Sequence, residues 1–124
     1  MLISSMSQYE SGFNTNASHV EKFKNSKQEN VVSRGLLQIS SESGNGYGCH
    51  IAAEADLDNP AINLACGVRI MNRYIVKDGV VTAHDGIWRG GARYWNVLRV
   101  ASTLPGIRNA TRSLPGCKAE MRRL

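Results

Sequence analysis

The sequence predicts a mainly α-helical single domain with little or no β-sheet. Two stretches, residues 2–11 and 60–77, repeat apolar side chains at the spacing of one helix face. No stretch alternates apolar and polar residues for long enough to predict a strand. The 124 residues, 42% of them hydrophobic, suit one core rather than two.

The first predicted helix covers residues 2–11, and Gly12 can end it. Glu10 then lies in the last turn, where the helix dipole disfavours a negative charge. A lone carboxyl held against apolar neighbours resists ionisation, so it can keep a proton near neutral pH. Glu10 is therefore a candidate general acid.

The next segments are predicted to be irregular. Residues 14–30 are rich in Asn, Ser and Lys and are expected to form a loop, with a helical turn near residues 20–24. Residues 34–41 are expected to form a short buried helix or turn. Residues 43–48 are glycine-rich but lack the spacing of a phosphate-binding loop, so a flexible connection is expected there.

The clearest predicted helix begins after Asn59, a good N-cap, with Pro60 at its first position. Its apolar repeat continues to about Lys77, and Asp78-Gly79 ends it. Shorter helices are expected in three later segments, which are residues 82–89, 92–102 and 107–114, with a break at Pro105-Gly106.

The charge of the chain is strongly basic. Fifteen basic and ten acidic residues give a formal charge of +5, and the pI is near 9.4. Such a surface attracts polyanions, which include nucleic acid and the carboxylates and phosphates of a bacterial cell wall. Residues 103–124 carry much of the excess, and we interpret them as a basic C-terminal extension with solvated charges. The basic residues concerned are Arg108, Arg112, Lys118, Arg122 and Arg123.

The N-terminal residues are a poor match to a signal peptide, because they lack a basic segment and a sustained apolar segment. No apolar run is long enough to span a membrane, so no transmembrane segment is expected. Because the sequence begins inside a predicted helix, we interpret it as a mature fragment, a truncated product or a protein exported by another route.

Three short motifs follow one another along the chain. They are ESGFN at residues 10–14, GLLQIS at residues 35–40, and PAINL at residues 60–64 with Gly67 behind it. This ordered set resembles the lytic transglycosylases of the soluble type, which are related in fold to goose-type lysozyme. The resemblance runs from Tyr9 to about Leu98, and it implies a lysozyme-like domain that acts on peptidoglycan.

The resemblance assigns the chemistry to Glu10. In the family this glutamate protonates the glycosidic oxygen between N-acetylmuramic acid and N-acetylglucosamine. It then accepts the proton of the C6 hydroxyl that attacks the anomeric carbon, so the product is a 1,6-anhydro sugar and no second carboxylate is needed. A hydrolase with paired carboxylates would need a second acid, and Glu42, Glu54 and Asp56 stay open for that role.

The resemblance also implies substrate-binding residues. Gln38 would hydrogen-bond the sugar near Glu10. Leu37, where the family often has Met, would be an apolar wall of the cleft or plain core. Asn63 would either face the cleft or serve as a buried structural residue, and Ser11 would support the loop around Glu10.

The family's later Ala-Tyr-Asn-x-Gly motif is changed in this chain. Trp88 takes the position of the tyrosine, where its ring could stack on a sugar, and Tyr94 is the counterpart if the alignment shifts. The family's further serine after the first motif is also displaced. Ser18 lies about one position early and His19 takes its place, so neither is assigned a role.

The resemblance places the protein in the periplasm or another extracytoplasmic space, where disulfides persist. On that ground we expect Cys49 and Cys66 to form a disulfide, which would contribute about 3 kcal/mol in the chain-entropy model. Three buried thiols are the alternative. Cys117 would be left free or paired outside the chain.

The leading hypothesis is a peptidoglycan lytic transglycosylase without metal or cofactor, serving a secretion or conjugation machine or a phage particle. The three histidines show no metal-ligand spacing. The alternatives are a goose-type lysozyme-like hydrolase and a non-catalytic peptidoglycan-binding module. A nucleic-acid binder would rest on charge alone, and no nucleic-acid partner is expected.

Overall fold

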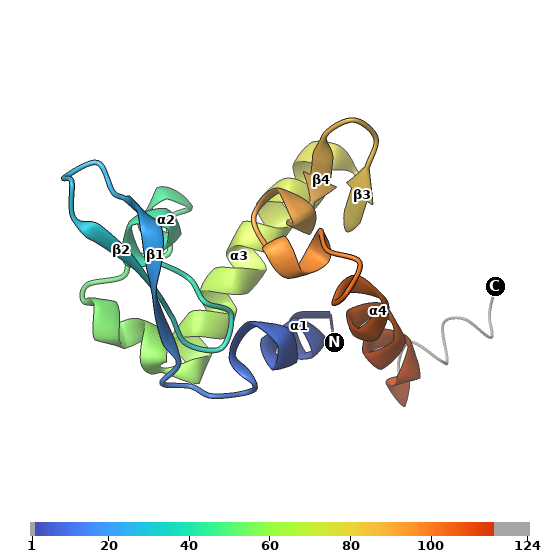
Figure 1. Cartoon of the computed structure of the whole chain (residues 1–124), viewed down its shortest axis with the longest axis horizontal. Coiled ribbons are helices and arrows are strands. Elements are labelled where there is room, and N and C mark those ends of the chain that lie inside the picture. The colour runs from blue at the N-terminus through green and yellow to red at the C-terminus, as the bar shows by residue number, and fades with distance from the viewer. Residues whose placement is uncertain (1, 116–124) are drawn as a thin grey trace.

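The computed structural model describes residues 2–115, which are arranged around one long central helix, α3 (Pro60–Asp78) (Figure 1). A hairpin and a short helix lie on one side of α3, and a second hairpin lies near its far end (Figure 1). The chain is helix-rich with two small antiparallel sheets, so the predicted fold class is confirmed. The other elements are α1 (Leu2–Ser11), β1 (Ser18–Lys24), β2 (Asn30–Arg34), α2 (Ser41–Gly46), η1 (Glu54–Asp58), β3 (Thr82–His84), β4 (Trp88–Gly90), η2 (Gly91–Arg93), η3 (Asn96–Leu98) and α4 (Leu104–Ser113).

Both long predicted helices are confirmed. Glu10 lies in the last turn of α1, and Gly12 follows that helix with φ +60°. The side-chain oxygen of Asn59 caps α3 by accepting hydrogen bonds from the N–H groups of Ala61 and Ile62. Gly79 ends the helix in the left-handed conformation. The motif-rich first half of the chain is therefore held by two helices whose ends are set by the sequence.

The predicted loop over residues 14–30 is wrong for residues 18–24 and residue 30, because β1 and β2 form an antiparallel hairpin there. The register pairs Ser18 with Arg34 and Lys24 with Asn30, and it shifts between Val20 and Lys24. Alternating burial is visible only in β2, and one of its inward residues is the polar Ser33. The hydrophobic alternation that predicts strands is therefore absent from the sequence.

The glycine-rich residues 43–48 do not form a flexible connection, because most of them lie in α2. Ser40 caps this helix, and its hydroxyl accepts the N–H of Ser43 at 3.3 Å. A Cβ at Gly44 would lie 3.1 Å from the sulfur of Cys66. The glycine therefore allows α2 to pack closely on α3. The preceding residues 35–38 form the predicted turn.

The predicted disulfide between Cys49 and Cys66 is present, with 5.3 Å between the two Cα atoms. It links the segment after α2 to the middle of α3. Cys117 lies outside the described residues.

The predicted helix over residues 82–89 is wrong, because β3 and β4 pair as a hairpin. The turn contains Asp85-Gly86, and Gly86 has φ +94°, which favours glycine. The predicted helix over residues 92–102 is replaced by the short 3₁₀ helices η2 and η3. The expected break at Pro105-Gly106 is also wrong, because proline is tolerated in the first turn of a helix and α4 begins at Leu104.

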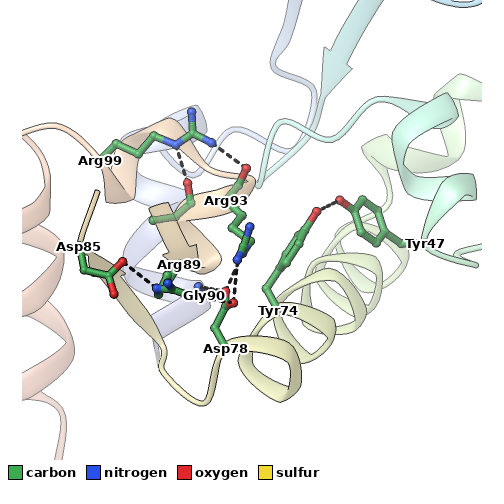
Figure 2. A network of polar contacts seen from close by, with 9 residues as sticks. Tyr47, Tyr74, Asp78, Asp85, Arg89, Gly90, Arg93 and Arg99 are labelled. Carbon is green, nitrogen blue, oxygen red and sulfur yellow. Dashed lines mark hydrogen bonds and ion pairs between the residues drawn. The ribbon is translucent and has the colours of Figure 1, made fainter. Parts of the chain in front are cut away.

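A buried ion pair joins the end of α3 to the second half of the chain (Figure 2). The Asp78 carboxylate accepts bonds from the Arg93 guanidinium at 2.6 and 2.8 Å and from the N–H of Gly90 at 2.6 Å. Arg99 donates to the carbonyls of Ala92 and Arg93, which fixes η2 from the other side (Figure 2). We call this set of contacts the Asp78 junction.

One hydrophobic core connects the two halves of the domain. Trp95 is 2% exposed, and its indole N–H donates to the carbonyl of Leu37 at 3.1 Å. Helix α4 packs against α1, so residues 104–113 of the predicted basic extension are part of the folded domain. Within residues 2–115, no helix has the length and apolar character that crossing a membrane requires. The largest fully buried side chains are Met6, Leu37, Ile39, Leu57, Ile70, Leu98, Ile107 and Asn63.

Candidate active site

A cleft of about 340 Å³ brings together side chains from α1, the first hairpin, the turn after β2, α2 and the segment before η3. A larger hollow of about 460 Å³ lies between α1, α3 and α4, but it is lined mainly by apolar side chains and contains no carboxyl. The smaller cleft is therefore the candidate active site. Its lining residues are Glu10, Glu21, Phe23, Val31, Ser33, Gln38, Ser40, Ser43, Tyr94, Trp95 and Asn96.

Glu10 keeps its proton at unusually high pH. Burial, with a smaller contribution from the nearby charge of Glu21, raises its pKa from 4.5 to about 7. None of the ion pairs among residues 2–115 involves Glu10. Its carboxyl can therefore act as an acid near neutral pH.

Glu21 is the cleft residue that the sequence analysis missed. Its Oε1 accepts a hydrogen bond from the Ser33 hydroxyl at 2.7 Å, and the Nε2 atom of His19 lies 3.8 Å from its Oε2. Glu21 and Phe23 of β1 both line the cleft. The sequence did not indicate Glu21 as a site residue, because residues 18–24 were predicted to form a loop.

The three acids left open for a second carboxylate lie elsewhere. Glu42 lines a neighbouring hollow, and Glu54 and Asp56 belong to η1. None of the three lines the cleft that contains Glu10. Glu21 is therefore the second carboxylate at this site.

Gln38 lines the cleft and is held there by its own side chain. Its Nε2 donates to the carbonyls of Ala17 at 3.1 Å and Gly35 at 3.0 Å. Both amide protons are thus bound within the protein, so the amide oxygen is the group that Gln38 can offer to a ligand. The Ser11 hydroxyl lies 3.0 Å from the carbonyl oxygens of Ser7 and Leu36, an arrangement that links the end of α1 to the turn bearing Gln38.

Leu37 and Asn63 are fully buried and do not line the cleft. Asn63 accepts the N–H of Leu37 at 3.0 Å and donates to the carbonyls of Arg34 and Leu57 at 2.9 Å. Leu37 is therefore not a wall of the cleft, and Asn63 does not face it. Leu37 is core, and Asn63 fixes the backbone of the turn before Gln38.

Of the two aromatic candidates, only Tyr94 lies in the cleft. Its hydroxyl bonds to that of Ser43, and burial raises its pKa. Trp88 lies on β4, where its ring stacks on His84 with centroids 4.1 Å apart. Tyr94 is therefore the aromatic residue that borders Glu10, and Trp88 packs within the second hairpin.

No group of three or more His, Cys, Asp or Glu side chains between residues 2 and 115 is arranged to hold a metal ion. The cleft offers carboxyl, amide and hydroxyl groups, which are suited to proton transfer and to hydrogen bonding with a sugar.

The chain belongs to the transglycosylase SLT domain family, whose model matches residues 1–83. It is also similar to solved structures of Bd0314 DslA. The wild-type form 2 is 45% identical with a TM-score of 0.87, and a glutamate-to-glutamine mutant of the same protein is 44% identical with a TM-score of 0.88. Each match covers 94% of this chain and 65% of that chain, so the chain spans about two thirds of the length of DslA.

A second DslA mutant is also 44% identical to this chain, with a TM-score of 0.86. The two mutants replace glutamates that are eleven residues apart in that chain. Glu10 and Glu21 have the same separation here. A search of curated protein sequences found no match.

Proposed function

We propose that this protein is a peptidoglycan lytic transglycosylase that cleaves the β-1,4 bond between N-acetylmuramic acid and N-acetylglucosamine. The observation that carries the proposal is the Glu10 carboxyl, whose pKa is raised to about 7 by burial and by Glu21. The SLT family, which includes this chain, supports peptidoglycan as the substrate. Such a substrate lies outside the cytoplasm, and the protein would act there.

The proposed reaction uses one group twice. Glu10 gives its proton to the glycosidic oxygen as the bond from that oxygen to the anomeric carbon breaks. The C6 hydroxyl oxygen of the muramic sugar then bonds to the anomeric carbon, and its proton returns to the Glu10 carboxylate. The products are a 1,6-anhydro-N-acetylmuramic end and a free C4 hydroxyl on N-acetylglucosamine, and the enzyme regains its starting state.

The other cleft residues have supporting roles in this proposal. The Glu21 charge keeps Glu10 protonated and stabilises the positive charge that develops at the anomeric carbon. The Gln38 amide oxygen accepts a hydrogen bond from the sugar. Tyr94 lines the cleft and is held by its hydrogen bond to Ser43. Ser11 supports the backbone between Glu10 and the turn before Gln38.

Hydrolysis is the second candidate reaction, and Glu21 is the observation that favours it. A hydrolase needs a second carboxylate to activate water or to attack the sugar, and Glu21 lines the same cleft as Glu10. The matching separation of the two mutated glutamates in DslA supports a role for both residues.

Mass spectrometry of peptidoglycan digested by the protein tests the proposal. We expect muropeptides that end in 1,6-anhydro-N-acetylmuramic acid. Ordinary reducing ends alone would exclude transglycosylation and establish the hydrolase. Glu10→Gln should lower turnover by about 10² to 10⁴ while binding to the wall is retained. Equal clearing of wall suspensions by both forms would refute the role of Glu10.

A secretion machine, a conjugation machine or a phage particle remains our proposal for the setting in which the enzyme opens the wall. A non-catalytic wall-binding module is the outcome to accept if neither type of product appears while binding persists.

A further inference from the structure

Phe23 is exposed without a structural reason. Its side chain is 62% exposed on β1, although neighbouring strand residues such as Val31 and Ser33 are buried. A large aromatic ring left in water forgoes the stabilisation that burial would give. The ring lines the candidate active site, which gives the exposure a use.

Phe23 and Glu21 both belong to β1, and both line the same cleft. Val31 of β2 lines the cleft on the same side. The hairpin therefore presents a carboxylate and an aromatic ring to the cleft that contains Glu10, with Glu10 near the carboxylate.

Beyond Phe23 the cleft continues into a second hollow of about 300 Å³. Phe23, Val31, Ser40 and Ser43 line both spaces, so the two spaces form one groove and these four residues lie where they meet. The far part has a polar lining of Lys24, Asn25, Ser26 and Glu42. The groove therefore extends beyond the space that contains Glu10 and Glu21.

We propose that Phe23 is a stacking platform for the sugar ring next to the cleaved bond, in a subsite that extends along the first hairpin toward Glu42. The ligand is a β-1,4-linked amino-sugar strand, whose pyranose rings present C–H groups that pack on an aromatic face. The inference rests on the proposed function, because it names a subsite of the same cleft. It makes Phe23 a residue that selects long strands over short ones.

Phe23→Ala tests the platform with peptidoglycan strands of graded length as substrate. We expect KM for long strands to rise about tenfold, which corresponds to about 1.4 kcal/mol, with little change in kcat. The effect should vanish for strands too short to reach the subsite. Phe23→Trp should restore the KM, because a larger aromatic ring can still stack.

Val20→Ala is the matched control, since Val20 is 57% exposed on the same strand and does not line the groove. We expect it to leave KM unchanged. The subsite is refuted if Phe23→Ala keeps the wild-type KM at every strand length, or if Val20→Ala raises KM equally.

A binding measurement separates this inference from the proposed function. If the wild-type protein releases no muropeptides, the catalytic proposal fails. Titration of the wild type and Phe23→Ala with β-1,4-linked N-acetylglucosamine oligomers then tests the platform alone. Weaker binding by Phe23→Ala supports the subsite, and equal binding refutes it.

Discussion

The cleft around Glu10 and the Asp78 junction each withdraw a carboxyl from water at the end of a helix, with opposite consequences. Glu10 lies in the last turn of α1 and Asp78 is the last residue of α3, where the helix dipole disfavours an anion in both cases. Yet the pKa of Glu10 is raised to about 7, and the pKa of Asp78 is lowered below its ordinary value.

The neighbours of each carboxyl explain the difference. Asp78 accepts hydrogen bonds from the Arg93 guanidinium and from the Gly90 N–H, and these outweigh the cost of its burial. Glu10 faces the carboxylate of Glu21. Burial alone therefore does not determine the charge of a carboxyl. At the junction the negative charge of Asp78 stabilises the fold through its bonds to Arg93 and Gly90. In the cleft the raised pKa lets Glu10 act as an acid, and ionising it lowers the stability of the folded state.

Between pH 5 and pH 8, the largest pH effect on stability should come from Glu10. Its folded pKa is above the unfolded value of 4.5, so the folded state binds the proton more tightly. The stability that this gives is fully present below about pH 4.5 and is lost as the pH rises through about 7. From pH 5 to pH 8 the wild type should lose up to about 3 kcal/mol relative to Glu10→Gln. Urea unfolding at both values measures this, and parallel pH profiles would contradict it.

Asp78→Asn should lower stability at neutral pH, because it leaves the Arg93 guanidinium without its carboxylate. Since the folded pKa of Asp78 is depressed, its contribution is present above its ordinary value of 3.8 and is lost as the pH falls through the folded pKa. Thermal unfolding at pH 7 measures the loss.

Asp85→Asn is the control, since Asp85 bonds Arg89 at 2.7 Å but is 58% exposed. Such a surface pair contributes about 0–1 kcal/mol. Equal melting temperatures for the two variants would contradict the account of the junction.

Glu21→Gln should make Glu10 more acidic, because it removes the second cause of the raised pKa and leaves burial, the larger cause. A general acid works only while protonated, so activity should begin to fall at a lower pH than in the wild type. The pH dependence of kcat/KM on peptidoglycan reports this shift. An unmoved alkaline limb would show that the two carboxylates are not coupled.

Tyr94→Phe should have the smallest effect. Tyr94 lines the cleft, where burial and the charge of Glu10 raise its pKa. Removing its hydroxyl deletes one bond to Ser43, worth about 1 kcal/mol, and kcat/KM should fall about fivefold. Trp88→Phe, outside the cleft, should leave kcat/KM unchanged. A larger loss for Trp88→Phe than for Tyr94→Phe would mean that Trp88 is the counterpart of the family's tyrosine.

The sequence predicted the helices because their ends carry strong local signals, such as the Asn59 cap, Pro60 and Gly79. It failed at both hairpins. The first has polar strands whose alternation is hidden, and the second depends on pairing around the Asp85-Gly86 turn. Strand pairing is set by contacts between segments, which a local pattern does not contain.

The site was predictable where a motif carries the chemistry, as at Glu10 and Gln38, both of which line the cleft. Glu21 was not, because only a strand turns it toward the cleft. The motifs also could not separate a residue that meets the substrate from one that supports the site. Asn63 belongs to the third motif, yet its buried side chain makes three hydrogen bonds to the protein backbone instead of facing the cleft.

The most direct test of the account is an NMR titration of the Glu10 side-chain carboxyl carbon in the folded protein, with Glu10→Gln to assign the signal. We expect the Glu10 carboxyl to titrate with a midpoint near pH 7. A midpoint near 4.5, the value for an ordinary glutamate, would mean that the cleft does not hold the proton and would contradict the role of Glu10 as the acid.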